Sequence, residues 1–377
     1  MSYLQRARQT LEAIRGEHRY RDLPQHGLSN VIDFSSNDYL GLATDPQVVE
    51  ALKRATRVGS GGARLLGGRQ REHALLENEL ADWLGRERAL LFSSGYLAGV
   101  GTIPVLAELV ETILSDQSNH ACLIDGIRLA RTPHSIYEHA TLPPTSTSKS
   151  LLVVSESIFG MDGDAIDPTA LLECLREQDV LLLDEAHALG IAGPQGAGLA
   201  RALDDPRILI LGTLSKALGS LGGFVAGPAT AIELLVNRAR SFIFDTALPP
   251  SLALASRIAL LLTRRGDDRR ERLRANAARL RAALDASPSS FDCAQDDITA
   301  LRKGSVEGPI VSVLLGSEER ALGVSEELWK RRIFVPAIRP PTVAPGTSRL
   351  RITIRADHTL DQVDMLAEEL RRCVATS

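Results

Sequence analysis

The strongest constraint on the fold is a series of short, continuous apolar runs separated by stretches with helical spacing. Stretches such as 168–179, between two of the runs, space their apolar residues as a helix does. Continuous rather than alternating apolar strands are buried on both faces, so the pattern predicts an α/β fold with a mainly parallel central sheet and helices on both faces. The expected strands are residues 89–94, 112–116, 151–157, 180–187, 207–215 and 222–227.

From about residue 250 the alternation of apolar runs and helical stretches gives way to a long helical stretch followed by short strand-like runs, which predicts a smaller C-terminal α+β domain. A long arginine-rich helix is expected over residues 252–286, followed by a polar loop at 286–297. Short strands are expected at 309–316, 333–338 and 349–354, and a closing helix at 360–373. We therefore expect an N-terminal segment (1–44), a large cofactor-binding domain (45–248) and a small domain (249–377).

Composition narrows the class of protein. The net charge of −4 gives no reason to expect nucleic acid or an anionic membrane as a partner. The N-terminal residues form a charged helical pattern and not a signal peptide, and the apolar run 258–263 is too short to span a bilayer. The four cysteines (122, 174, 293 and 373) have no metal-binding spacing. We expect free thiols, no metal and a cytoplasmic protein.

Two features at the ends of expected strands could bind a ligand. In "SSGYLAG" (93–99) an expected strand runs into Gly95 and then into a helix. The free backbone N–H groups at the start of such a helix suit a phosphate, although the turn can also be a simple connection between strand and helix. In "DEAHALG" (184–190), Asp184 could hold a cationic ring nitrogen and His187 a neighbouring oxygen. The alternatives for Asp184 are a carboxylate at a solvated strand end or a helix cap. A metal site is a poorer explanation, because no second group of histidines or cysteines has matching ligand spacing.

Lys216 is the third feature, in the nearly uncharged run "LGTLSKALGS" (211–220) of a chain with only five lysines among its 43 basic residues. Burial lowers the pKa of an ammonium and leaves a free amine, which can form an imine with a carbonyl, whereas arginine cannot. A snorkelling surface lysine is the alternative. Taken in order, a phosphate cradle, an acid–histidine strand end and a strand-terminal lysine are what pyridoxal phosphate requires. His120 in "SNHACL" could stack on such a ring, or serve as a loop or N-cap residue.

Ordered blocks along nearly the whole chain resemble the α-oxoamine synthases, pyridoxal-phosphate enzymes with the aspartate-aminotransferase fold (fold type I). Members join an amino acid to an acyl thioester and release carbon dioxide. The wording of the first and last blocks implies L-alanine and a pimeloyl thioester as substrates, the acyl group being carried on coenzyme A or on acyl carrier protein. The blocks are "DFSSNDYLGLA", "GSGGARLLGG", "ALLFSSGYLAG", "SNHACLIDG", "SESIFGMDGD", "LLLDEAHALGIAG", "GTLSKALGSLGGF", "PIVSVLLG" and "IRPPTVAPGTSRLRITI".

The resemblance implies a role for each matching residue. Lys216 would bind the cofactor covalently, Asp184 would pair with its ring nitrogen, His187 would meet its ring hydroxyl oxygen and His120 would stack on its face. Of these, Lys216, Asp184 and His120 would be the catalytic residues. Residues near the phosphate would be Gly95, Tyr96, Thr213 and, from the partner subunit of a homodimer, Thr246. The substrate residues would be Arg21, Asn37, Thr342 and one or both of Arg339 and Arg349.

One departure from the family pattern is Gly160, which stands where members often have serine near the cofactor. Gly160 can offer only its backbone, so we expect the cofactor to be held slightly less firmly, by about 1 kcal/mol for one hydrogen bond. Two alternatives to the alanine-specific activity stay open. The chain could be another member of the family, such as a glycine C-acetyltransferase, 5-aminolevulinate synthase or serine palmitoyltransferase, or a non-catalytic scaffold homologue.

Overall fold

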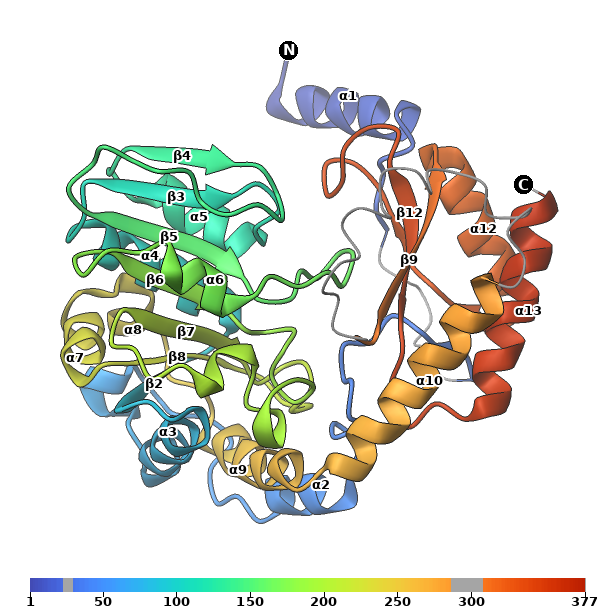
Figure 1. Cartoon of the computed structure of the whole chain (residues 1–377). Helices are drawn as coiled ribbons and strands as arrows, with labels where there is room; N and C mark the ends of the chain where they lie inside the picture. The colour runs from blue at the N-terminus through green and yellow to red at the C-terminus, as the bar shows by residue number, and fades with distance from the viewer. Residues whose placement is uncertain (23–29, 286–307, 377) are drawn as a thin grey trace.

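The computed structural model describes residues 1–22, 30–285 and 308–376. Figure 1 shows a larger body built on one sheet and a smaller body beside it, with helices α2 and α9 at the base between them. The N-terminal helix α1 (Tyr3–Gly16) lies at the top of the smaller body and buries none of its side chains. The boundaries predicted at residues 44 and 248 stay predictions.

The larger body is built on a seven-stranded sheet in the order β2-β8-β7-β6-β5-β3-β4. The neighbours from β7 through β4 pair in parallel, and β8 runs antiparallel to both β7 and β2. This agrees with the predicted mainly parallel sheet. The strands are β2 (Arg88–Phe92), β3 (Thr112–Asp116), β4 (His134–Tyr137), β5 (Leu151–Glu156), β6 (Val180–Asp184), β7 (Ile208–Thr213) and β8 (Gly223–Gly227).

Helices cover both faces of this sheet, because successive apolar residues of each strand enter two different cores. In β5, Leu152 and Val154 pack with α4, α5, α7 and α8, whereas Leu151 and Val153 pack with α3, α6 and α9. The helices are α2 (Pro46–Lys53), α3 (Arg71–Leu84), α4 (Gly95–Ala107), α5 (Ala121–Leu129), α6 (Pro168–Glu173), α7 (Ala229–Arg238), α8 (Arg240–Ile243) and α9 (Pro250–Arg264). A short turn, η1 (Arg64–Gly68), lies between α2 and α3, and two more, η2 (Pro194–Gly196) and η3 (Leu199–Ala202), lie between β6 and β7.

The smaller body contains an antiparallel sheet in the order β11-β12-β9, with helices packed against it (Figure 1). A parallel pair, β1 with β10, joins the chain near residue 32 to this body. Its core is continuous with one core of the larger body. The elements are β1 (Ile32–Asp33), α10 (Asp267–Asp285), β9 (Ile310–Gly316), α12 (Glu318–Lys330), β10 (Ile333–Phe334), β11 (Ala337–Ile338), β12 (Ser348–Thr353) and α13 (Leu360–Thr376).

Several local expectations were wrong in detail. The single helix expected over 252–286 is two helices, α9 and α10, separated at Arg265 and Gly266, where glycine disfavours a continuous helix. The strand expected at 333–338 is split into β10 and β11. The edge strand β4 was not predicted; three of its four residues are exposed, so it lacks the apolar run that marked the others.

Two expectations from composition can be compared with the described residues. Cys122 and Cys174 are free thiols, and Cys373 forms no disulfide with either of them. Cys293 and the loop expected at 286–297 lie outside the described residues. Within the described ranges, no helix combines the length and the apolar character needed to cross a bilayer.

Candidate active site

Polar side chains gather where the parallel strands β5, β6 and β7 end. Glu156 is the last residue of β5 and lies directly opposite Asp184, the last residue of β6, in the strand register. Thr213 ends β7, the next strand of the sheet. Ligands of open α/β sheets bind outside these carboxyl ends, so this edge is the candidate active site.

The structure places Lys216 directly against His187. The Lys216 Nζ lies 2.8 Å from His187 Nε2, and the lysine is part-buried and does not snorkel over the surface. Burial lowers the pKa of Lys216, an effect that Asp184 and Glu156 oppose by their charge. Burial also holds the pKa of His187 well below its ordinary value, so this imidazole is neutral. The pair therefore contains the amine that imine chemistry needs.

Asp184 is buried, which excludes the solvated strand end as its explanation. Its carboxylate accepts the backbone N–H of Ala186 at 2.8 Å, and only 4% of the residue is exposed. Burial raises the pKa of Asp184, whereas the charges of Lys216 and His120 lower it. A buried carboxylate of this kind favours a cationic partner, such as a protonated ring nitrogen.

Glu156 is a second buried carboxylate that the sequence analysis missed. Burial and the neighbouring Asp184 raise its pKa to about 8. Its Oε1 accepts the backbone N–H of His120 at 2.6 Å, so it anchors the segment that carries this histidine. The only signal was its position at the end of the run "LLVVSES".

His120 is the N-cap of α5, which was the predicted alternative to a ring-stacking role. Its Nδ1 accepts the backbone N–H of Cys122 at 3.2 Å and lies 3.0 Å from the Cys122 thiol. Burial of the ring lowers the pKa of His120, which Asp184 partly offsets. The residue remains exposed on one side, so the predicted stacking role is compatible with its position.

The predicted phosphate turn has the expected strand–glycine–helix geometry. Gly95 is the first residue of α4, whose N-cap Ser94 accepts the N–H of Leu97 at 3.2 Å. A β-carbon on Gly95 would lie 3.1 Å from Cβ of Thr213, and one on Gly223 would lie 2.4 Å from the Gly95 nitrogen. Only glycines allow this close approach, which brings the backbone N–H of a helix N-terminus beside the Thr213 hydroxyl.

The remaining predicted cofactor residues have other partners. Tyr96 is exposed and its hydroxyl donates to Asp125. Thr246 is exposed and pairs with Ala63 in an isolated β-bridge. The carbonyl of Gly160 accepts the Arg351 Nε at 2.5 Å, so its backbone is already engaged.

The predicted substrate residues form two groups. Arg21 Nη2 lies 3.4 Å from Thr342 Oγ1, and Arg339 donates to the backbone carbonyl of His18 at 2.6 Å. These contacts bring residues near the two ends of the chain together. Arg349 instead forms an ion pair with Asp162.

Arg351, which was passed over in favour of Arg339 and Arg349, is the arginine that reaches Asn37. Both terminal nitrogens of Arg351 lie 3.1 Å from Asn37 Oδ1, and its charge acts on Lys216 and His187. It lies two residues beyond Arg349 on β12, so the two were indistinguishable in the motif. The structure therefore adds a third candidate for binding a substrate carboxylate.

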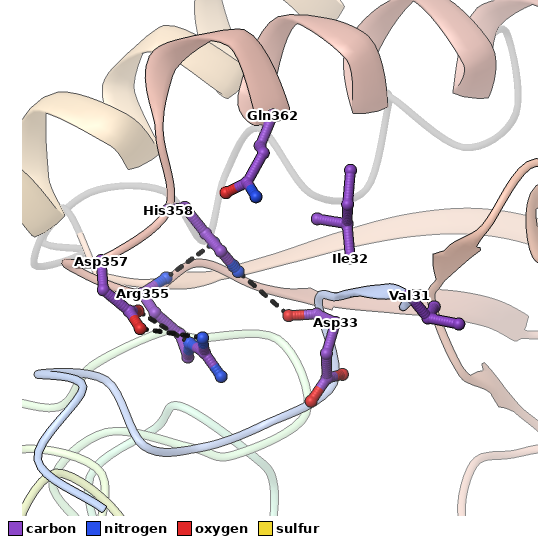
Figure 2. A pocket seen from close by; sticks show the side chains of 7 residues that line it. All are labelled: Val31, Ile32, Asp33, Arg355, Asp357, His358 and Gln362. Carbon is purple, nitrogen blue, oxygen red and sulfur yellow. Dashed lines mark hydrogen bonds and ion pairs between the residues drawn. The ribbon is translucent and has the colours of Figure 1, made fainter. Parts of the chain in front are cut away.

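A separate hollow of about 430 Å³ lies between β1 and the start of α13 (Figure 2). His358 Nδ1 accepts the backbone N–H of Arg355 at 3.1 Å, so its Nε2 donates to the backbone carbonyl of Asp33 at 3.0 Å. Arg355 forms an ion pair with Asp357. None of the predicted site residues lines this hollow, so it does not compete with the candidate active site.

The described residues fit pyridoxal phosphate. Lys216 supplies an amine of lowered pKa, and Asp184 supplies a buried carboxylate. The turn at Gly95, beside Thr213, leaves room for an anion, because a side chain on Gly95 or Gly223 would occupy this space. His120 lies at the exposed side of the same edge. This donor set matches the covalent, ring-nitrogen and phosphate contacts that the cofactor needs.

The chain is similar to known proteins along most of its length. The family profile for aminotransferases of class I and II matches residues 29–370. An 8-amino-7-oxononanoate synthase from Methylococcus capsulatus is 42% identical, over 91% of this chain and 89% of its own. Another from Anaeromyxobacter dehalogenans is 45% identical, over 90% of this chain and 85% of its own.

Solved structures of similar proteins share the fold. A serine palmitoyltransferase from Sphingomonas wittichii superposes with a TM-score of 0.85 at 26% identity, covering 98% of this chain and 96% of that one. An 8-amino-7-oxononanoate synthase from Francisella tularensis gives 0.74 at 26% identity, covering 92% of this chain and 99% of that one.

Proposed function

This chain belongs to the aminotransferase class I and II family and, within it, to the pyridoxal-phosphate-dependent 8-amino-7-oxononanoate synthases, and we propose that it condenses L-alanine with a pimeloyl thioester. The products are 8-amino-7-oxononanoate, carbon dioxide and the free thiol of the carrier. The observation that carries the proposal is the position of the Lys216 amine. It lies 2.8 Å from His187, at the edge of the sheet where β6 ends with Asp184.

We infer the following division of work among the residues. Lys216 would hold the cofactor through its Nζ, and its amine of lowered pKa would take the α-proton of alanine. The negative charge of Asp184 would hold a proton on the ring nitrogen of the cofactor. Pyridoxal phosphate, when bound, supplies an electron sink for the negative charge on the substrate α-carbon.

Other side chains bind and orient. The N-terminus of α4 with Thr213 would hold the phosphate, and His120 would cover one ring face. Arg351 with Asn37 is suited to the alanine carboxylate, and Arg21, Arg339 and Thr342 to the distal carboxylate of the pimeloyl chain, because guanidinium groups bind carboxylates through paired N–H donors.

We also propose a homodimer. Val58, Leu65, Leu66 and Phe244 are 91%, 52%, 85% and 68% exposed. They lie on neighbouring segments, since Ala63 bridges Thr246. Such an apolar surface favours burial against a second copy, and Thr246 lies beside it, as expected for a residue that reaches the partner's phosphate.

A substrate assay tests the activity. The purified holoenzyme is incubated with L-alanine, glycine or L-serine against pimeloyl, acetyl, succinyl and palmitoyl thioesters. The proposal expects turnover with alanine and pimeloyl, and comparing coenzyme A with acyl carrier protein identifies the carrier. Because the serine palmitoyltransferase from Sphingomonas wittichii gives the higher TM-score of the two solved structures, preferred use of serine with a palmitoyl thioester is the specific result that would replace it.

Lys216→Arg tests the lysine directly. A guanidinium cannot form an imine, so we expect no visible absorbance from bound cofactor and activity reduced to background. Lys330→Arg, at an exposed lysine paired with Glu327, is the control. Borohydride reduction of the wild-type holoenzyme should place the adduct on Lys216 in a peptide map, and an adduct on any other lysine contradicts the assignment.

A further inference from the structure

Tyr39, in the block "SSNDYLGL", is a buried group to which the proposed reaction assigns no role. The residue is fully buried, and its hydroxyl oxygen lies 2.6 Å from His187 Nδ1 and 3.2 Å from Asn37 Oδ1. Burial raises the pKa of Tyr39 to about 12, so the hydroxyl keeps its proton at any pH at which the enzyme works. The hydroxyl therefore has one proton to donate and two neighbouring acceptors.

Asn37 is the poorer of the two acceptors. Its Oδ1 already accepts two N–H groups of Arg351, each at 3.1 Å, and the Tyr39 oxygen lies 0.6 Å closer to His187 than to it. The Tyr39 proton is thus directed to Nδ1 of His187. A neutral imidazole that accepts at Nδ1 carries its own proton on Nε2.

The Nε2–H of His187 then points at Lys216, whose Nζ is 2.8 Å away. An N–H donor requires a lone pair on its partner, and the Nζ of lysine has one only as the free amine. In the other tautomer, a bare Nε2 would accept a hydrogen bond from the ammonium form. The direction of the Tyr39 hydrogen bond therefore determines which protonation state of Lys216 this contact favours.

We propose that Tyr39 is a positioning residue whose hydroxyl proton holds His187 in the Nε2–H tautomer and thereby keeps Lys216 a free amine. Arg351 contributes at the far end of this chain of contacts by occupying the Asn37 carbonyl. The inference concerns side chains of the protein alone, so it does not depend on which amino acid or thioester the enzyme uses.

Other charges around Lys216 act on the same equilibrium. Asp184 and Glu156, at the ends of neighbouring strands, favour the ammonium form, while Arg351 on β12 opposes it. His120 lies at the same edge of the sheet and interacts with both Asp184 and Lys216. Burial and the charge of Arg351 favour the amine and the two carboxylates favour the ammonium, so the hydrogen bond from His187 is the directional contact through which Tyr39 can shift this balance.

The test measures the protonation of Lys216 by competitive labelling. The full-length chain, freed of cofactor, is treated with a trace of acetic anhydride over a range of pH, and each lysine is quantified by peptide mapping. With Tyr39→Phe we expect several-fold slower labelling of Lys216 at pH 7 and a higher midpoint for its titration. The exposed Lys53, Lys149 and Lys330 serve as internal references whose rates stay unchanged.

Tyr137→Phe is the matched control, because it removes the hydroxyl of another buried tyrosine, on β4, away from His187. It should leave the Lys216 titration as in the wild type. An unchanged Lys216 titration in a folded Tyr39→Phe protein would overturn the proposal. If that variant does not fold, ¹⁵N NMR of the wild-type protein decides: a ring proton of His187 on Nε2 supports the proposal, and one on Nδ1 overturns it.

Discussion

Gly160 packs so closely on His187 that a side chain at this position would displace the imidazole. A β-carbon there would lie 2.3 Å from Nε2 of His187, the atom that contacts Lys216. The sequence analysis expected glycine only to loosen the cofactor by removing a hydroxyl. The structure adds that, in this chain, the space a serine would need is filled by His187, which Tyr39 holds from its other side.

We therefore predict that Gly160→Ala lowers kcat/KM by about 5- to 150-fold, since overpacking typically costs about 1–3 kcal/mol. Steady-state kinetics and retention of the cofactor on dialysis are the measurements. The control is Gly323→Ala on α12, where no atom lies within 4 Å of the added carbon. Wild-type kinetics for Gly160→Ala would show that His187 can move without loss.

At the scale of secondary-structure elements, His139 joins the sheet to the loop between β5 and α6. Its Nδ1 lies 2.9 Å from Asp116 at the end of β3, and its Nε2 2.9 Å from Asp164 in that loop. The same loop carries Gly160, whose carbonyl contacts Arg351, and Asp162, which pairs with Arg349. His139 thus fixes a segment that contacts both sheets.

The stability contributed by His139 should depend on pH. Burial alone would lower its pKa, but the hydrogen bonds to Asp116 and Asp164 outweigh burial and raise it to about 10, from about 6.5 in the unfolded chain. A raised pKa stabilises the fold fully below pH 6.5, and the contribution disappears as the pH rises to 10.

We predict that His139→Gln lowers Tm most below pH 6.5 and that the difference from the wild type shrinks toward pH 10. Thermal unfolding at a series of pH values measures this. His134→Gln, at an exposed histidine on β4, is the control and should give no such trend. A Tm difference that stays constant from pH 6 to 10 would mean that His139 is not charged in the folded protein.

At the scale of the whole molecule, the exposed side chains of Val58, Leu65, Leu66 and Phe244 predict a dimer. Leu66→Asp places a charge in the middle of this surface, so we expect a monomer, or a much weaker dimer, in light scattering coupled to size-exclusion chromatography. Leu109→Asp, at a leucine 58% exposed beyond the end of α4, should stay dimeric.

If Thr246 completes the partner's site, the Leu66→Asp protein should also lose activity in parallel with its loss of dimer. Activity measured at rising protein concentration tests this link, because mass action restores the dimer. A fully active monomer would show that each copy contains a complete site.

The sequence alone determined the framework of this protein. Continuous apolar runs identified the parallel strands, because burial on both faces is recorded in the composition of each strand. Lys216, Asp184, His187 and His120 were predicted as site residues because each lies at or just beyond the end of an expected strand, and strand ends of a parallel sheet meet at one edge.

Only the tertiary structure decided which side chains contact one another at that edge. Arg349 and Arg351 are equivalent in the motif, but the pairing of β12 with β9, which shifts at Ser348, directs one to Asp162 and the other to Asn37. The Tyr39–His187 contact joins residues 148 positions apart. Local patterns encode the faces of helices and strands, whereas partners distant in sequence depend on register and packing, which no short stretch of sequence records.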